Sequence, residues 1–289
     1  MAQNTASAPA APAAARVGSP ALAWWGVILA AAAVIFGPTL VWLVDRWWTD
    51  HFYQHGILIA LVTGWLVWKA LPEAQALPEQ SHPLGTPLIL GGLLVQMAAA
   101  LMGVMTASAL AGVVVTTGLL LVWKGRAVFR PLGFPLFFFL FAVPVATAGS
   151  EASGLILAPM MELAARSAAG VCQAIGLDAK LSGTIVRLPG YTMQIVAPCS
   201  GMSSLVSLMP LAALLGHLSG ARPGRIAMLI LSAFPIAYVA NVTRLTLTAL
   251  LGVSFGAKVA SGFLHDLSGH FTFFLGAAAL ALIPRGSSK

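Results

Sequence analysis

The sequence is poor in charged residues, since Asp, Glu, Lys and Arg make up 8% of its 289 residues. A soluble domain carries about a quarter of its residues as charges, which cover its surface. With 59% hydrophobic residues and a mean hydropathy of +0.92, most side chains here must face lipid instead. Long apolar runs favour helices over barrel strands, because a helix satisfies its own backbone hydrogen bonds within hydrocarbon. The sequence therefore predicts an all-α polytopic membrane protein.

Cysteine is also scarce, and Cys172 and Cys199 are the two in the chain. Two cysteines exclude a disulfide framework, but they leave open one bridge between them or a free reactive thiol. The sequence contains no Walker loop and no dinucleotide fingerprint, so we expect neither a cofactor nor a metal. The net charge is +7, but the basic residues do not form a stripe with aromatic residues between them. We therefore expect no nucleic-acid partner.

Apolar runs predict about eight transmembrane helices, because each run is close to the roughly 20 residues that cross about 30 Å of hydrocarbon. The predicted spans are 21–44, 56–70, 86–104, 107–123, 132–149, 198–219, 226–250 and 268–284. Residues 1–20, rich in Ala, Pro and Ser, are interpreted as a disordered cytoplasmic tail. Residues 21–285 then form a single transmembrane domain.

Basic residues predict the orientation, since Lys and Arg concentrate in short cytoplasmic loops. Placing the N-terminus inside puts the cluster at 124–130 and the pair Arg222 and Arg225 in the cytoplasm. Both termini are then cytoplasmic, and the membrane is taken to be the inner (plasma) membrane. One longer outer loop, about 150–197, is expected between the fifth and sixth spans.

This outer loop is predicted to carry local structure. Ala158–Ile175 is expected to form a helix lying on or dipping into the interface. From Ser182 to Val196, β-branched residues alternate along the chain and the pattern breaks at Pro189-Gly190, which predicts a β-hairpin. The hairpin would deliver the chain directly to Cys199.

Cys199 is expected at the outer start of the sixth span, after Pro198, which fits a first helical turn. Unpaired backbone N–H groups and the positive end of the helix dipole would favour a thiolate there. Ser200, Ser203 and the neighbouring Ser204 add hydroxyl groups beside the cysteine.

Two further polar residues are expected at the same depth and on the same outer side of the membrane. Arg244 lies toward the outer end of the seventh span, with Asn241 three residues earlier on the same helical face. His265 lies at the outer entry of the eighth span. Ionisable residues within spans are costly, which makes each of them a functional candidate.

Cysteine, histidine and arginine together predict acyl transfer from a peptide bond through a thioester. A thiolate attacks the acyl carbon, an imidazole moves the proton to the departing amine, and a guanidinium stabilises the oxyanion. The acceptor, water or another nucleophile, stays open. Each residue also has a structural interpretation, such as a packing cysteine or a snorkelling arginine. The competing functions are a small-solute transporter or channel that uses Arg244 as an anion site, and a non-catalytic assembly subunit.

The motifs around these residues carry a family resemblance. They are Ala-Pro-Cys-Ser-Gly-Met around Cys199, Ala-Asn-Val-Thr-Arg ending at Arg244, and His-Asp-Leu-Ser-Gly beginning at His265. Two weaker matches are residues 52–58 and 134–144. The sequence resembles the exosortase/archaeosortase family of multipass membrane transpeptidases over nearly the whole chain after residue 20.

The resemblance implies that Cys199 is the nucleophile and that Arg244 and His265 are its partners. It also implies that the substrates are exported proteins with a C-terminal sorting tail, made of a Pro-Glu-Pro-type motif, an apolar helix and a basic end. His270 competes with His265, but the glycine four residues after His265 matches the family. Residues expected to bind substrate or support the site are Ser200, Gly201, Ser203, Asn241, His55 and His270. The sequence does not predict the oligomeric state.

Overall fold

The computed structural model describes the backbone of residues 19–145, 151–261 and 263–283; the side chains of 19–29, 151–153 and 260–271 lie outside this description. The chain forms two compact units, residues 1–38 and 39–289. Helix α1 (Ser19–Thr49) begins in the first unit and ends in the second. The predicted tail, residues 1–20, lies almost wholly outside the described residues.

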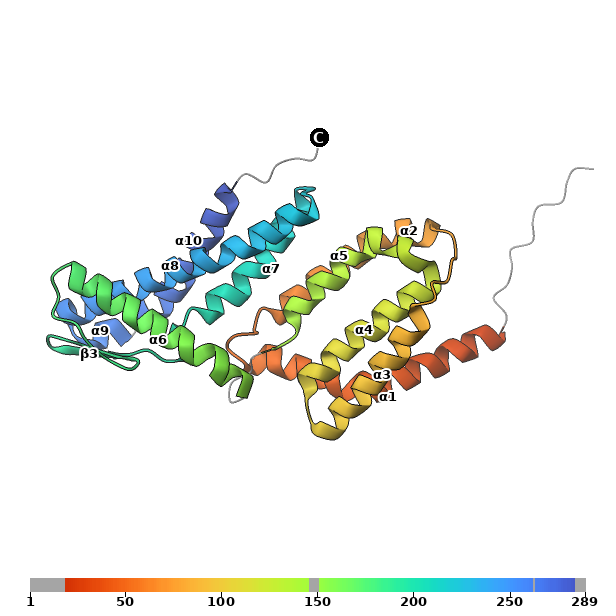
Figure 1. The fold of residues 1–289 in the computed structure, drawn as a ribbon, viewed down its shortest axis with the longest axis horizontal. Helices are drawn as coiled ribbons and strands as arrows, with labels where there is room; N and C mark the ends of the chain where they lie inside the picture. Colours follow the sequence, from red (N-terminus) through yellow and green to blue (C-terminus); the bar gives the residue numbers. More distant parts are fainter. Residues whose placement is uncertain (1–18, 146–150, 262, 284–289) are drawn as a thin grey trace, which may run out of the picture. The chain divides into compact units, whose positions relative to one another are not determined.

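The second unit contains all the other elements and is mostly helical (Figure 1). Its α-helices are α2 (Gly56–Ala76), α3 (Gly85–Met102), α4 (Met105–Lys124), α5 (Phe129–Phe139), α6 (Glu151–Ala174), α7 (Met202–Leu218), α8 (Pro223–Phe255), α9 (Ala257–Ser261) and α10 (Phe263–Leu282). Short 3₁₀ helices are η1 (Gly125–Val128), η2 (Leu140–Ala142) and η3 (Ala197–Cys199). Strands β1 (Lys180–Ser182), β2 (Ile185–Leu188) and β3 (Tyr191–Gln194) form one antiparallel sheet in that order.

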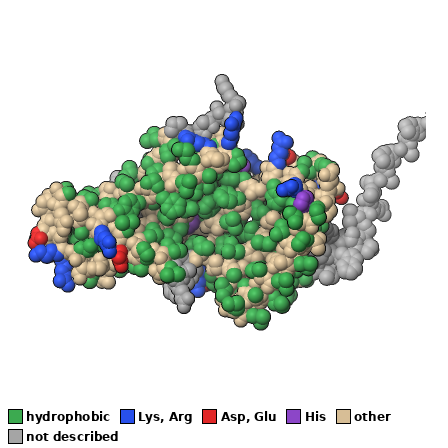
Figure 2. Space-filling model, viewed as in Figure 1, with side chains coloured by type: hydrophobic (Ala, Val, Ile, Leu, Met, Phe, Trp, Pro, Cys, Tyr) green, Lys and Arg blue, Asp and Glu red, His purple; other side chains and the backbone are tan. Residues whose placement is uncertain are grey.

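Six helical runs in the described residues are long and apolar enough to cross a membrane. The helix α7 and the stretch Thr272–Leu282 of α10 are apolar but shorter. Large apolar side chains remain exposed on these helices, for example Leu101 at 83% and Trp48 at 75%. In Figure 2 hydrophobic side chains cover much of the visible face, and most charged ones lie toward its margins. The chain is a polytopic membrane protein, because such a surface requires lipid as its solvent.

The region predicted as an outer loop contains a longer helix than expected. Helix α6 begins at Glu151 rather than at Ala158, and its part Gly154–Ala174 is long and apolar enough to cross a membrane. Its charged residues Glu162 and Arg166 pair with each other at 3.3 Å one turn apart. The span predicted at 132–149 corresponds to α5 and η2, which end at Ala142. The number of spans and the side of each terminus therefore stay predictions.

The hairpin expected around Pro189-Gly190 is formed by β2 and β3, in which Leu188 lies opposite Tyr191. Strand β1, which the sequence pattern did not predict, pairs with the other edge of β2. Alternate residues of the sheet, such as Val186 and Met193, are buried in an apolar cluster with Leu245 of α8. Cys199 belongs to the same cluster. The sheet therefore packs beside the residue that the sequence singles out.

The helices that carry the candidate site pack against one another. Helix α8 contacts α6, α7 and α10, α10 also contacts α7, and α2 contacts α5. Two hydrogen bonds join residues 47–53, which precede α2, to the end of η2 and to the residues that follow η2. The indole N–H of Trp47 donates to the carbonyl of Ala142 at 2.7 Å, and the backbone N–H of Val145 donates to the Tyr53 hydroxyl at 3.1 Å. These contacts position the segment that ends at His55.

Candidate functional site

Cys199 lies on η3, three residues before α7 begins. Pro198 lies in the first turn of a helix as expected, but that helix is the short η3 and not α7. Gly201 adopts a left-handed conformation with φ of +88° and separates η3 from α7, so the predicted start of the sixth span at residue 198 is four residues early. The first backbone N–H of α7, that of Met202, donates to the Ser200 hydroxyl at 3.2 Å. That hydroxyl donates in turn to the carbonyl of Ala197 at 2.7 Å. Ser200 therefore stabilises the turn that presents Cys199.

Arg244 contacts the sulfur of Cys199 directly. Its Nη2 donates to Cys199 Sγ at 3.5 Å, and the two residues are 8% and 5% exposed. Arg244 lies inside α8, and Cys199 precedes α7, so packing of these two helices brings the pair together. The sequence had predicted this proximity from membrane depth alone. The contact places a fixed cation directly against the sulfur in a buried site.

Asn241 holds the backbone of the same cysteine. Its Nδ2 donates to the carbonyl of Cys199 at 2.9 Å, and the side chain is 2% exposed. Gly201 allows this approach, because a Cβ atom there would lie 3.2 Å from Asn241 Cβ. Asn241 and Arg244 are one turn apart on α8, so one helix face holds both the carbonyl and the sulfur of Cys199.

Three buried polar atoms have no hydrogen-bond partner within the described part of the chain: Arg244 Nε and Asn241 Oδ1, on the two residues that contact Cys199, and Oγ of Ser203, four residues after the cysteine. A buried polar group left unpaired costs about 1–3 kcal/mol. The set contains a donor, an acceptor and a hydroxyl that can do either. A peptide bond presents the complementary C=O and N–H groups.

Tyr191 of the hairpin also lies at the site, although it belongs to none of the motifs that predicted the site from the sequence. Its ring packs on Gly252 of α8 so closely that a Cβ at Gly252 would lie 2.3 Å from Tyr191 Cδ1. Burial, and then the negative charge of Cys199, raise the pKa of the Tyr191 hydroxyl. A tyrosine directly after a Pro-Gly turn and shortly before the cysteine was the available signal in the sequence.

The family model described as transmembrane exosortase (Exosortase_EpsH) matches residues 47–282. This match runs from the end of α1 to the end of α10 and includes every motif of the candidate site. The chain belongs to the transmembrane exosortase family. The resemblance stated from the motifs is thereby confirmed. No curated protein and no solved structure matches this exosortase-family chain.

The two candidate histidines of this exosortase-family chain lie on the first turns of α10, which packs against α7 and α8. The side chains of His265 and His270 fall outside the described side chains. The choice between them therefore stays a prediction.

Cys172 and Cys199 are both free thiols, and both are buried in the apolar cluster under the sheet. Of the two alternatives left open by the sequence, the structure therefore shows two thiols rather than a bridge. Within the described residues no group of three His, Cys, Asp or Glu side chains could hold a metal ion.

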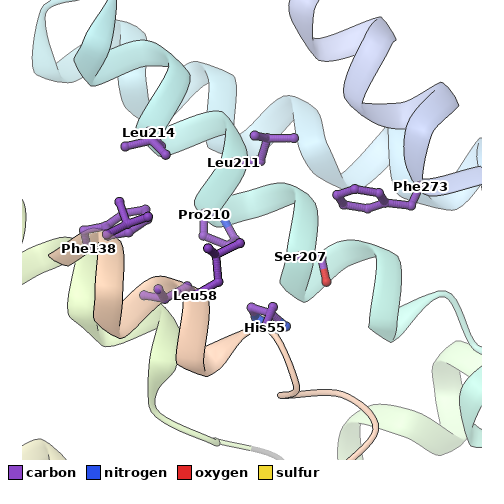
Figure 3. Close-up of a pocket in the computed structure, with 10 residues that line it drawn as sticks. His55, Leu58, Phe138, Ser207, Pro210, Leu211, Leu214 and Phe273 are labelled. Carbon is purple, nitrogen blue, oxygen red and sulfur yellow. The ribbon is translucent and has the colours of Figure 1, made fainter. Parts of the chain in front are cut away.

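His55 lies at a different place, an apolar cavity of about 270 Å³ between α2, α5, α7 and α10 (Figure 3). Neither Cys199 nor Arg244 lines this cavity. Burial lowers the pKa of His55 to about 4, so the imidazole is neutral at physiological pH. Its Nε2 is buried and has no hydrogen-bond partner among the described residues.

Proposed function

We propose that this chain is a membrane-embedded cysteine endopeptidase and transpeptidase. It cleaves the C-terminal sorting tail of exported proteins, made of a Pro-Glu-Pro-type motif and a transmembrane helix, through a thioester on Cys199. The observation that carries the proposal is the buried contact between Arg244 Nη2 and Cys199 Sγ. We propose that the site faces the outer side of the inner membrane, where an exported substrate arrives.

The first half-reaction breaks the scissile peptide bond. The thiol of Cys199 gives its proton to an imidazole, its sulfur attacks the carbonyl carbon to form a C–S bond, and the carbonyl oxygen becomes an oxyanion. The guanidinium of Arg244 stabilises that charge, since it stays protonated and presents rigid donors. A histidine of α10, His265 in our assignment, gives its proton to the nitrogen of the departing tail, and the C–N bond breaks. The N-terminal part of the substrate is then held as a thioester.

The second half-reaction releases the product. Water or an amine attacks the thioester carbonyl, loses its proton to the neutral histidine, and the C–S bond breaks to regenerate Cys199. Apolar residues in the cluster that contains Cys199, such as Leu245 and Ala249, limit the access of water to its sulfur. Exclusion of water favours transfer to an amine over hydrolysis.

The unpaired polar atoms of Asn241 and Ser203 suit substrate positioning. Asn241 Oδ1 can accept a hydrogen bond from a backbone N–H, and Ser203 Oγ can donate one to a backbone carbonyl. Asn241 also holds the carbonyl of Cys199. We assign Ser203 and Asn241 to binding an extended peptide on either side of the scissile bond.

Processing of a tailed substrate in cells tests this proposal. We expect Cys199→Ala to abolish shortening of an exported protein that carries a Pro-Glu-Pro-type tail, with the membrane protein still inserted. Cys172→Ala is the matched control, because Cys172 is a second free, buried thiol in the same apolar cluster. It should leave shortening intact. Shortening that persists in Cys199→Ala would show that Cys199 is not the nucleophile.

A further inference from the structure

The apolar cavity that His55 lines lies on the helix that follows Cys199 (Figure 3). Cys199 is three residues before α7, and residues 207 to 214 of α7 line the cavity. At 3.6 residues per turn, these lining residues and a serine in the first turn of α7 fall within an arc of about 100° on one helix face. They are Ser203, Ser207, Pro210, Leu211 and Leu214. One face of α7 therefore extends from the turn after Cys199 into the cavity.

The lining changes from polar to apolar with distance from Cys199 along α7. Ser207 is the first lining residue of α7, and His55 lies at the same end of the cavity, whereas Leu214 and Phe138 lie toward the other end (Figure 3). The Nε2 atom of His55 is buried and has no hydrogen-bond partner in the described part of the chain. A peptide that extends from Cys199 into the cavity would therefore meet polar groups first and apolar side chains after them.

The cavity carries no charge that could pair with a charged ligand. No aspartate, glutamate, lysine or arginine lines it. A charged group enclosed there would lose its water without gaining a partner. Of the parts of the proposed sorting tail, this lining excludes the basic end and the glutamate of the motif, and it suits the apolar helix.

The size of the cavity fits side chains of a helix and not the helix itself. One turn of an α-helix, about 10 Å across and 5.4 Å long, takes about 400 Å³, which is more than the cavity of about 270 Å³. At about 30 Å³ for each heavy atom, the cavity takes about nine heavy atoms, the size of two leucine side chains or one aromatic side chain. The lining from Ser207 to Leu214 rises about 10 Å, and side chains one turn apart are separated by about 6 Å. Two aliphatic side chains on consecutive turns therefore fit both the volume and the length.

A helix in the bilayer can reach the cavity from the lipid side of α2. Leu58 lines the cavity and is 63% exposed, and Leu61 on the same helix is 67% exposed. A substrate helix can lie along this opening with its backbone outside the cavity. It would then insert the side chains of one face, in the way that one helix packs against another.

We propose that this cavity is a subsite for the apolar helix of the sorting tail, and that it takes two large apolar side chains, one turn apart, beyond the scissile bond. The proposal rests on the proposed function, which supplies the tailed substrate. From Met202 to Pro210, in the middle of the lining, α7 rises about 12 Å. An extended chain covers that distance in about four residues and a helix in about eight. We therefore expect the two side chains within about the fourth to the ninth residue after the scissile bond.

Disulfide crosslinking in cell membranes tests the subsite without the peptidase chemistry. The full chain carries Val62→Cys in the cavity together with Cys199→Ala and Cys172→Ala, and single cysteines are scanned along the tail of a co-expressed substrate. After oxidation with copper phenanthroline, we expect crosslinking to peak within the predicted stretch, at positions one helical turn apart. Leu61→Cys in place of Val62→Cys is the matched control, and it should give no such peak because Leu61 faces lipid.

Complementary changes of size test whether the cavity selects the substrate. Val62→Phe fills part of the cavity, so it should slow the shortening of a substrate with leucine at the crosslinked positions at least about fivefold. Alanine at those substrate positions should restore the rate, because the smaller side chains leave room for the phenylalanine ring. Leu61→Phe should leave the rates of both substrates unchanged.

The failure of the subsite differs from the failure of the proposed function. Crosslinks spread evenly along a tail that the unmodified protein shortens normally overturn the subsite alone, whether or not Val62→Phe folds. A folded Val62→Phe variant that shortens the leucine and alanine substrates at equal rates also overturns it. If the unmodified protein shortens no tailed substrate, the proposed function fails, and the crosslinking profile decides whether the cavity binds the tail.

Discussion

Two residues of α8 hold different atoms of Cys199. Arg244 donates to the sulfur and Asn241 donates to the carbonyl, and all three residues are buried. The sequence predicted the proximity of Cys199 and Arg244, because charge asymmetry and apolar periodicity are enough to assign membrane depth. It could not predict the bond from Asn241 to a backbone carbonyl, since that bond depends on the turn at Gly201.

Arg244→Lys tests the role of the guanidinium. Lysine keeps the charge but replaces a planar fork by a point donor on a different stem, so we expect processing to fall by about 10²–10³, as when one oxyanion donor is lost. The measurement is the rate at which a tailed substrate is shortened. Arg166→Lys, on the exposed surface of α6, is the control and should leave the rate of shortening unchanged. A rate for Arg244→Lys within twofold of the unmodified protein would contradict the role.

Asn241→Ala tests whether the carbonyl of Cys199 must be held. Loss of one buried hydrogen bond costs about 1 kcal/mol, which corresponds to roughly a fivefold loss of rate. We expect the maximal rate of processing to fall by about that factor, because the sulfur loses its fixed position beside Arg244. Thr243→Ala, an exposed position on the same helix, should leave the rate unchanged. An unchanged maximal rate in Asn241→Ala would mean that the bond is merely structural.

At the scale of elements, the sheet and α8 form the wall behind Cys199. The hairpin was predictable, because alternating β-branched residues around Pro189-Gly190 are a local signal. Strand β1 was not predictable from its three residues, and its pairing with β2 depends on the chain between them. The full length of α6 was not predicted, since the helix was expected to begin at Ala158 and it begins at Glu151.

Gly252→Ala tests the contact between the hairpin and α8. The new Cβ would overlap the Tyr191 ring, which lies 2.3 Å away, and overpacking of this kind costs about 1–3 kcal/mol. We expect a lower midpoint of thermal unfolding and slower processing, because the ring must leave its place beside Cys199. Gly224→Ala on the same helix meets no atom within 4 Å and should be neutral. Equal unfolding midpoints and equal processing rates of the two variants would show that the hairpin can shift away from α8 without a loss of stability.

At the scale of the whole molecule, the membrane class followed from composition alone, and the family model over residues 47–282 agrees with the motifs. The number of crossings is harder to predict. Helix α6 has the length of a span but lay in a predicted loop, and α7 is shorter than a typical span although it was predicted as one. Length and hydropathy do not decide such cases, because packing against neighbouring helices also sets depth.

Reporter fusions test the predicted topology. Both termini are expected in the cytoplasm, so green fluorescent protein fused after residue 289 should fluoresce and alkaline phosphatase fused there should be inactive. A fusion at Arg222, between α7 and α8, should give the same pattern, because the basic loop is expected inside. An active phosphatase at the C-terminus would show an odd number of crossings from a cytoplasmic N-terminus, as an additional crossing by α6 would produce.

Catalysis through Cys199 requires a thioester between its sulfur and the substrate. The direct measurement is mass spectrometry of the membrane protein isolated after brief exposure to a tailed substrate under denaturing, acidic conditions. We expect a peptide containing Cys199, and not one containing Cys172, that carries the substrate's new C-terminal residues and loses them in hydroxylamine. Shortened substrate together with an unmodified Cys199 at every time point, or an adduct on Cys172 instead, would contradict it.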